Sequence, residues 1–186
     1  MNHWTPPAPG PCVLGVRIRE PLTLGHVLLL AELGSPIVLG GAILPGDIAL
    51  AVFVTAQPHT EARKDVERWW APLLMRWWGR RMSKRDFTAE ADAFVEWFVE
   101  SSKSPAFWRQ ESASNRECAA PWWINRLALA MGNLGMSYAD AVNMPLKTLG
   151  QLTMAFSEAR GEVQLVSRRE AEFHELVARL EAQKRN

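Results

Sequence analysis

The stretch LTLGHVLLLAELGSPIVLGGAILPGDIALAVFVTAQ, residues 22–57, decides the fold of this chain. Its apolar residues recur at the spacings of three and four that are typical of helices. Thr23 is a suitable N-cap for a first helix, and Gly34 stands where a C-cap would end it. Pro45 suits the first turn of a second helix, which would run to about Gln57. Both helices are apolar on most sides, so we expect them to be buried.

The same stretch also argues against a membrane-spanning segment. A bilayer span needs about 20 uninterrupted apolar residues, whereas this stretch is broken by Glu32, Gly34, Pro36, Gly40, Gly41, Pro45 and Asp47. The segment 1–11 is rich in proline and does not have the basic and apolar regions of a secretory signal. Cys12 and Cys118 are too few for a disulfide framework, and free thiols agree with a reducing compartment. We therefore expect a cytoplasmic protein with no membrane partner.

Helix signals continue through most of the remaining chain. The predicted helices cover about 61–81, from 87 to a polar stretch at 101, from 121 to 132 or 135, 137–143 and 145–161. Pro72 must lie at a kink or break within the first of these. The fold class that follows is all-α, with a compact helical domain of about six or seven helices over residues 13–161.

Other segments depart from this helical pattern. Residues 1–12 carry four prolines and read as an extended Pro-rich N-terminal arm. Residues 13–19 alternate loosely between apolar and other residues, which predicts one short strand. Residues 101–121 are polar and bracketed by prolines, so we expect a long loop there.

A last helix is predicted over residues 162–186, where an apolar stripe recurs at helical spacing. The stripe consists of Phe173, Leu176, Val177 and Leu180, among charged residues of both signs. A narrow seam of this kind suits pairing with one other helix, in this domain, in a second copy or in a client protein. Packing on the chain's own core is the alternative.

No residue pattern resembles a catalytic, metal or cofactor site. The four histidines lie far apart and outside any metal-ligand spacing, and no serine or cysteine stands in a nucleophile context. The glycines form no phosphate-binding loop. We expect His26, on an apolar helix, to be a core or helix-start residue. The sequence therefore predicts a non-enzymatic protein without a metal or a cofactor.

Tryptophan is the unusual feature of the composition, with nine tryptophans against a single tyrosine. A small domain cannot easily bury so many indole rings, and tryptophan is enriched where an apolar surface meets a partner. We therefore predict protein-binding surfaces that include Trp69, Trp70, Trp77, Trp78, Trp122 and Trp123, together with the C-terminal stripe Phe173, Leu176, Val177 and Leu180.

Basic residues alternate with aromatic ones over residues 76–85, a pattern that can hold a phosphate backbone while stacking bases. The residues for such a role are Arg76, Arg80, Arg81, Lys84 and Arg85. The simpler interpretation is a helix end whose arginines favour the negative pole of the helix while the tryptophans pack inward. Because the net charge is only +1, we expect nucleic-acid binding to be absent or nonspecific.

Several short runs resemble a known family. Pro21-Leu22-Thr23-Leu24-Gly25-His26, Leu28-Leu29-Leu30, Gly34-Ser35-Pro36 and Met144-Pro145-Leu146 resemble the tail assembly chaperones of tailed bacteriophages, over roughly residues 16 to 160. The resemblance implies a small helical protein that binds the tape measure protein, prevents aggregation of its long helices and helps to bring tail-tube subunits to it.

The sequence and this resemblance together predict an assembly factor of a bacteriophage tail or related particle, which binds apolar helices of a client. The expected partners are tape measure or tail tube proteins, and a homo-oligomer is compatible with the pattern. The expected location is the cytoplasm, that of the host cell for a phage-encoded chain. Two alternatives remain open: a structural subunit of the virion or tail-like particle, and a small nucleic-acid-binding protein that uses residues 76–85.

Overall fold

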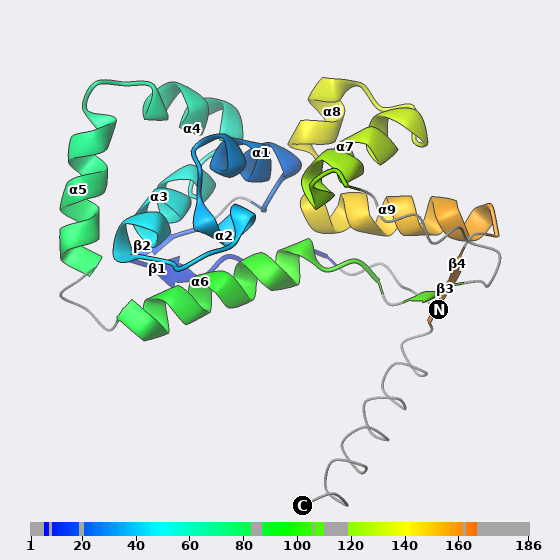
Figure 1. Cartoon of the computed structure of the whole chain (residues 1–186), viewed down its shortest axis with the longest axis horizontal. Coiled ribbons are helices and arrows are strands. Elements are labelled where there is room, and N and C mark those ends of the chain that lie inside the picture. The colour runs from blue at the N-terminus through cyan, green and yellow to red at the C-terminus, as the bar shows by residue number, and fades with distance from the viewer. Residues whose placement is uncertain are drawn as a thin grey trace, which may run out of the picture.

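A computed structural model of the chain describes residues 6–7, 9–18, 21–82, 87–105, 107–109, 119–161 and 163–166. Over these residues the protein consists of nine helices and four very short strands, which confirms the all-α prediction. Figure 1 shows two groups of helices: α1 to α6 form the first group, and α7, α8 and α9 form a second group beside it. The described residues form more helices than the expected six or seven, because the predicted segment 61–81 forms two helices and a one-turn helix lies at Pro36–Leu39.

The stretch that decides the fold forms three helices: α1 (Leu24–Glu32), α2 (Pro36–Leu39) and α3 (Pro45–Thr55). Thr23 caps α1 as predicted, with its hydroxyl accepting a hydrogen bond from the backbone N–H of His26. Ser35 and Pro36 do not merely interrupt the chain but begin the one-turn helix α2. The interior faces of α1 and α3 are almost wholly buried, and they form the centre of the core.

The predicted long helix over 61–81 is two helices, α4 (His59–Val66) and α5 (Ala71–Met82). Pro72 lies in the first turn of α5, where a missing backbone N–H costs nothing because no partner within the helix exists there. The turn over residues 67–70 redirects the chain. α5 therefore packs beside α3 at one edge of the molecule (Figure 1).

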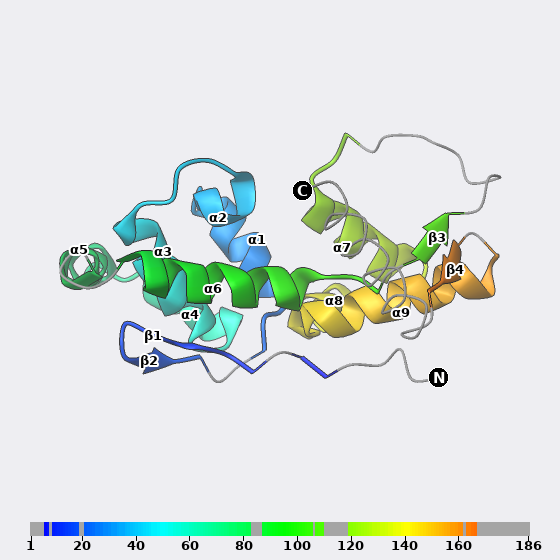
Figure 2. The same ribbon diagram turned by 90° about the horizontal axis from the view of Figure 1, so that it is seen from below.

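The second half contains α6 (Phe87–Ser102), α7 (Trp122–Gly132), α8 (Tyr138–Asn143) and α9 (Leu146–Ala159). Ser137 caps α8, because its Oγ accepts from the Asp140 N–H at 3.1 Å. α9 is tied to the start of the core by a 2.7 Å hydrogen bond from the Leu146 N–H to the Leu22 carbonyl. α6 runs lengthwise along the other helices of the first group, and its C-terminal end approaches α9 (Figure 2).

The predicted strand over 13–19 was wrong in its extent, because this segment is a tight hairpin. β1 (Cys12–Val13) pairs antiparallel with β2 (Val16–Arg17), in the register Val13 opposite Val16. Leu14 and Gly15 between them both have positive φ angles of 57° and 75°, which the two-residue turns of tight hairpins require. Glu90 of α6 supports the turn by accepting a 2.7 Å hydrogen bond from the Leu14 N–H.

A second two-stranded sheet joins segments that the sequence did not suggest. β3 (Phe107–Arg109) lies within the predicted loop, and it pairs antiparallel with β4 (Val163–Leu165). β4 therefore replaces the start of the predicted C-terminal helix. The rest of that helix, from residue 167 onward, lies outside the described residues.

Part of the Pro-rich arm is described and lies against the domain. The Pro11 carbonyl accepts a 3.0 Å hydrogen bond from the Ile18 N–H. A Cβ on Gly10 would come within 2.1 Å of the Ile18 carbonyl oxygen, so only glycine allows this approach. Pro9 and Pro11 line one side of a cavity against α6. Residues 9–11 are therefore docked on the domain rather than extended away from it.

Candidate functional site

The tryptophan pairs around α5 each divide between the core and the surface. The first member of each pair is exposed, with Trp69 at 82% and Trp77 at 54% of full exposure. Trp70 and Trp78 are half-buried and pack edge-on against Phe53 of α3, with ring centroids 6.4 and 6.2 Å apart. The interpretation that the tryptophans of the segment 76–85 pack inward therefore holds for Trp78 but not for Trp77.

The pair at the start of α7 is divided less sharply. Trp122 and Trp123 meet edge to face at 5.7 Å. Trp123 is half-buried beside the core, whereas Trp122 is 36% exposed. Because Trp122 lies at the first residue of α7, its ring projects toward the C-terminal half of α6 and contributes to a groove there.

This groove is a concave surface with a mainly apolar lining. It has a volume of about 540 Å³. Its walls come from α2 and the loop to α3, from the C-terminal half of α6, and from α7, and Figure 2 shows these elements on the same side of the molecule. The apolar side chains that line it are Ile37, Ile43, Val95, Phe98, Val99 and Trp122.

Exposed apolar side chains lie in the groove and in the segment between α2 and α3. Val99, which lines the groove, is 48% exposed. Leu39 and Leu44, which flank the lining residues Gly40, Gly41 and Ile43 in the sequence, are 53% and 63% exposed. Gly40 and Gly41 have φ angles of 85° and 131° that side chains rarely allow. Exposed apolar side chains around a concave apolar surface are typical of a partner-binding site.

Arg126 fixes the position of Trp122 at the groove. Its guanidinium lies 5.3 Å from the centre of the Trp122 ring, in cation–π contact. The same group donates hydrogen bonds to the Ser102 carbonyl at 2.7 Å, to Ser104 Oγ at 2.9 Å and to the Leu146 carbonyl at 3.3 Å. Arg126 therefore joins α7 to the C-terminal end of α6 and to the start of α9. Burial lowers the pKa of this guanidinium from its ordinary value.

The lining of the groove also includes one charged side chain, Lys103. Lys103 forms a 3.0 Å ion pair with Glu100, which also accepts from Lys147 of α9 at 3.0 Å. Hydrogen bonds from Lys103 and Lys147 lower the pKa of the Glu100 carboxyl below its usual value. The site therefore combines a mainly apolar groove with one cationic group, a combination that suits an amphipathic helix.

His26 is a structural residue, as the sequence indicated. It is only 1% exposed. Its Nδ1 accepts from the Thr23 N–H at 3.1 Å, and its Nε2 donates to the Gln57 carbonyl at 2.8 Å. These two bonds require the neutral imidazole with its proton on Nε2, and they join the start of α1 to the end of α3. Burial is the main cause that lowers the pKa of His26 to about 4, and His59 nearby adds to it.

Some predicted site residues lie outside the described part of the chain: Lys84, Arg85, Phe173, Leu176, Val177 and Leu180. Arg81 is placed only by its backbone, within α5. Sequence reasoning missed the aliphatic wall of the groove and Arg126. One signal was available in the sequence: Arg126 follows Trp122 by four residues, a spacing that places the two side chains on one face of a helix.

Within the described ranges no group of three metal-ligating side chains comes together. Of the helices in those ranges, none combines the length and the apolar character that a bilayer crossing requires. Comparison with protein family models found no match for this chain. No curated protein has a significantly similar sequence, and no solved structure has a significantly similar fold.

Proposed function

We propose that this chain is a non-enzymatic assembly factor of a bacteriophage tail or related particle, and that the groove between α2, α6 and α7 holds an apolar helix of its client. The observation that carries the proposal is the groove itself: a concave surface of about 540 Å³ with a mainly apolar lining. Helix-in-groove recognition uses such surfaces, with anchors of the client at i, i+3 or i+4, and i+7.

The resemblance to tail assembly chaperones names the class of client, which is a tape measure protein with long helices. Such helices expose apolar seams before assembly, and a groove that covers one seam lowers the chance that two clients aggregate. Lys103 is the charged side chain in the lining of the groove, and it offers an ion-pair or hydrogen-bond partner to a polar group of the client helix.

Co-expression with the tape measure protein encoded in the same genome tests the proposal. The client should be soluble and should copurify with this chain, and it should aggregate when expressed alone. A client that is equally soluble alone, or that fails to copurify, would contradict the proposed function.

Mass spectrometry of purified mature particles separates this proposal from the structural-subunit alternative. An assembly factor should be missing from the finished particle. A structural subunit should be found there in stoichiometric amounts, and that result would replace the first proposal by the second.

A further inference from the structure

We propose that the outer face of α5, with the turn before it, is a second interaction surface that binds an acidic amphipathic helix of a partner protein. This surface consists of Trp69, Leu73, Arg76, Trp77 and Arg80, and we call it the α5 face. It lies at the edge of the molecule away from α7, as Figure 1 shows. The proposal therefore stands whether or not the groove binds a client.

The apolar part of the α5 face forms one seam. Trp69, Leu73 and Trp77 are spaced four residues apart and are 82%, 61% and 54% exposed. Leu73 and Trp77 lie on the same side of α5, because residues four apart share a helix face, and Trp69 lies in the turn just before the helix. The opposite side of α5 is already used, since Trp78 packs on Phe53. Two large exposed apolar side chains on α5 and a third in the turn before it match the seam of one partner helix.

The seam ends at a pocket that can take an anchoring side chain. A cavity of about 310 Å³ lies beside Trp77, between α5 and the tip of the β1–β2 hairpin, and Leu14, Gly15 and Val16 line its other side. Interface anchors are apolar side chains that fill such pockets.

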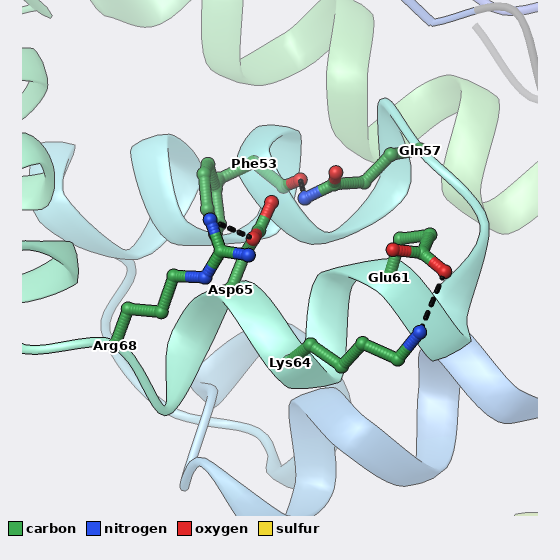
Figure 3. Close-up of polar contacts among 6 residues, drawn as sticks. All are labelled: Phe53, Gln57, Glu61, Lys64, Asp65 and Arg68. Atoms are coloured by element: carbon green, nitrogen blue, oxygen red, sulfur yellow. Dashed lines mark hydrogen bonds and ion pairs between the residues drawn. The ribbon is translucent and has the colours of Figure 1, made fainter.

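The charge of the α5 face selects the partner. Arg76 and Arg80 are exposed beside the seam, and between Glu67 and Asp86 the sequence has basic residues but no acidic one. Two acidic groups of α4 are engaged elsewhere: Asp65 pairs with Arg68 at 3.4 Å and Glu61 with Lys64 at 2.9 Å, as Figure 3 shows. The arginines of the α5 face therefore have room for carboxylates of a partner.

Two other occupants fit these observations less well. A second copy of the chain, docked through the same face, would bring arginines together, and like charges across an interface oppose binding. A nucleic acid would use the arginines and could stack on the two indole rings, but Leu73 at the centre of the seam offers no stacking surface and would lie against phosphates. An acidic amphipathic helix uses all five residues.

Fluorescence anisotropy with the full chain tests the proposal. The probe is a labelled helical peptide with leucines at i, i+4 and i+8 flanked by glutamates, and the control peptide has the same leucines flanked by lysines. The glutamate peptide should bind roughly tenfold more tightly, because each exposed ion pair contributes a factor of a few and the lysine peptide adds repulsion.

Variants assign the effect to the α5 face. Arg76→Gln with Arg80→Gln should remove the preference, so that both peptides bind alike, whereas Trp77→Ala should weaken both peptides about tenfold or more. Tyr138→Ala, at a residue of α8 that is 56% exposed, is the matched control and should change neither affinity. All these side chains are exposed, so the thermal unfolding midpoints should stay close to that of the parent.

Three results would overturn the proposal. One is equal affinity for the two peptides, and another is failure of the glutamate peptide to bind. The third is a submicromolar, salt-sensitive affinity for a single-stranded oligonucleotide or for anionic phospholipid vesicles that exceeds the peptide affinity and disappears in the double arginine variant.

Discussion

Replacing Arg126 by alanine should loosen the junction between the two groups of helices. This guanidinium is half-buried and donates three hydrogen bonds that join α7 to the end of α6 and the start of α9. The Ser102 carbonyl, at 2.7 Å, lies at the last residue of α6. A cation is favourable there because the C-terminal end of a helix carries partial negative charge.

The size of the effect follows from these contacts. A hydrogen bond from a charged donor contributes about 1.5–3 kcal/mol, so three independent bonds would contribute roughly 5–9 kcal/mol. The bonds share one group and are partly open to solvent, and alanine also relieves the desolvation of the guanidinium, so their sum overstates the loss. We expect the free energy of unfolding to fall by about 2–4 kcal/mol, which lowers the melting midpoint by about 5–15 °C.

Urea denaturation followed by circular dichroism measures this loss, and Arg63→Ala is the matched control. Arg63 pairs with Glu32 on the surface, where both side chains are about half exposed. Exposed pairs contribute only about 0–1 kcal/mol, so this control should lose far less stability. If Arg63→Ala and Arg126→Ala cost the same, Arg126 would not join the helices as described.

Three further changes should have measurable effects. The pKa of His26 is about 4 in the folded chain against 6.5 for an ordinary histidine, so its contribution to stability is complete above pH 6.5 and is lost as the pH falls toward 4. The loss of unfolding free energy should reach about 3 kcal/mol. His26→Gln should flatten the pH dependence of this free energy between pH 4 and 6.5. An unchanged slope in the variant would exclude His26 as the source of the pH dependence. Gly25→Ala should destabilise the fold by about 1–3 kcal/mol, because the new Cβ would lie 2.5 Å from the His59 ring. Adding His59→Ala should restore most of the lost stability. A Gly25→Ala variant more stable than the parent chain would refute the clash. If the C-terminal apolar stripe binds a partner and not the chain's own core, deleting residues 163–186 should leave the melting midpoint nearly unchanged while abolishing oligomerisation or client binding; an insoluble or unfolded product would assign that segment to the core.

The helical elements were predictable from sequence where local chemistry specifies them. Thr23 and Ser137 are caps whose side chains satisfy backbone N–H groups at helix starts, and Pro45 begins a helix as its fixed backbone angle predicts. The break between α4 and α5 was only partly predictable. Pro72 marked it, but the turn lies before the proline, because proline is tolerated in the first turn of the following helix.

The β3–β4 pairing was not predictable, because its two strands come from segments about 55 residues apart and neither has a strong strand pattern. Neither was the division of the tryptophan pairs. Trp77 and Trp78 are identical residues in adjacent positions, and only the packing of α5 on Phe53 decides which one faces solvent. The groove likewise depends on tertiary structure, since its walls come from α2, α6 and α7.

The affinity of a client helix for variants of the groove tests the central claim most directly. Val99→Glu places a charge at a 48% exposed position inside the apolar lining, and Met131→Glu places the same charge at a 43% exposed residue of α7 that does not line the groove. Isothermal titration with a helical fragment of the tape measure protein should show a loss of about tenfold or more for Val99→Glu, and no change beyond about twofold for Met131→Glu. Equal affinities for the two variants and the parent chain would contradict a client helix in this groove.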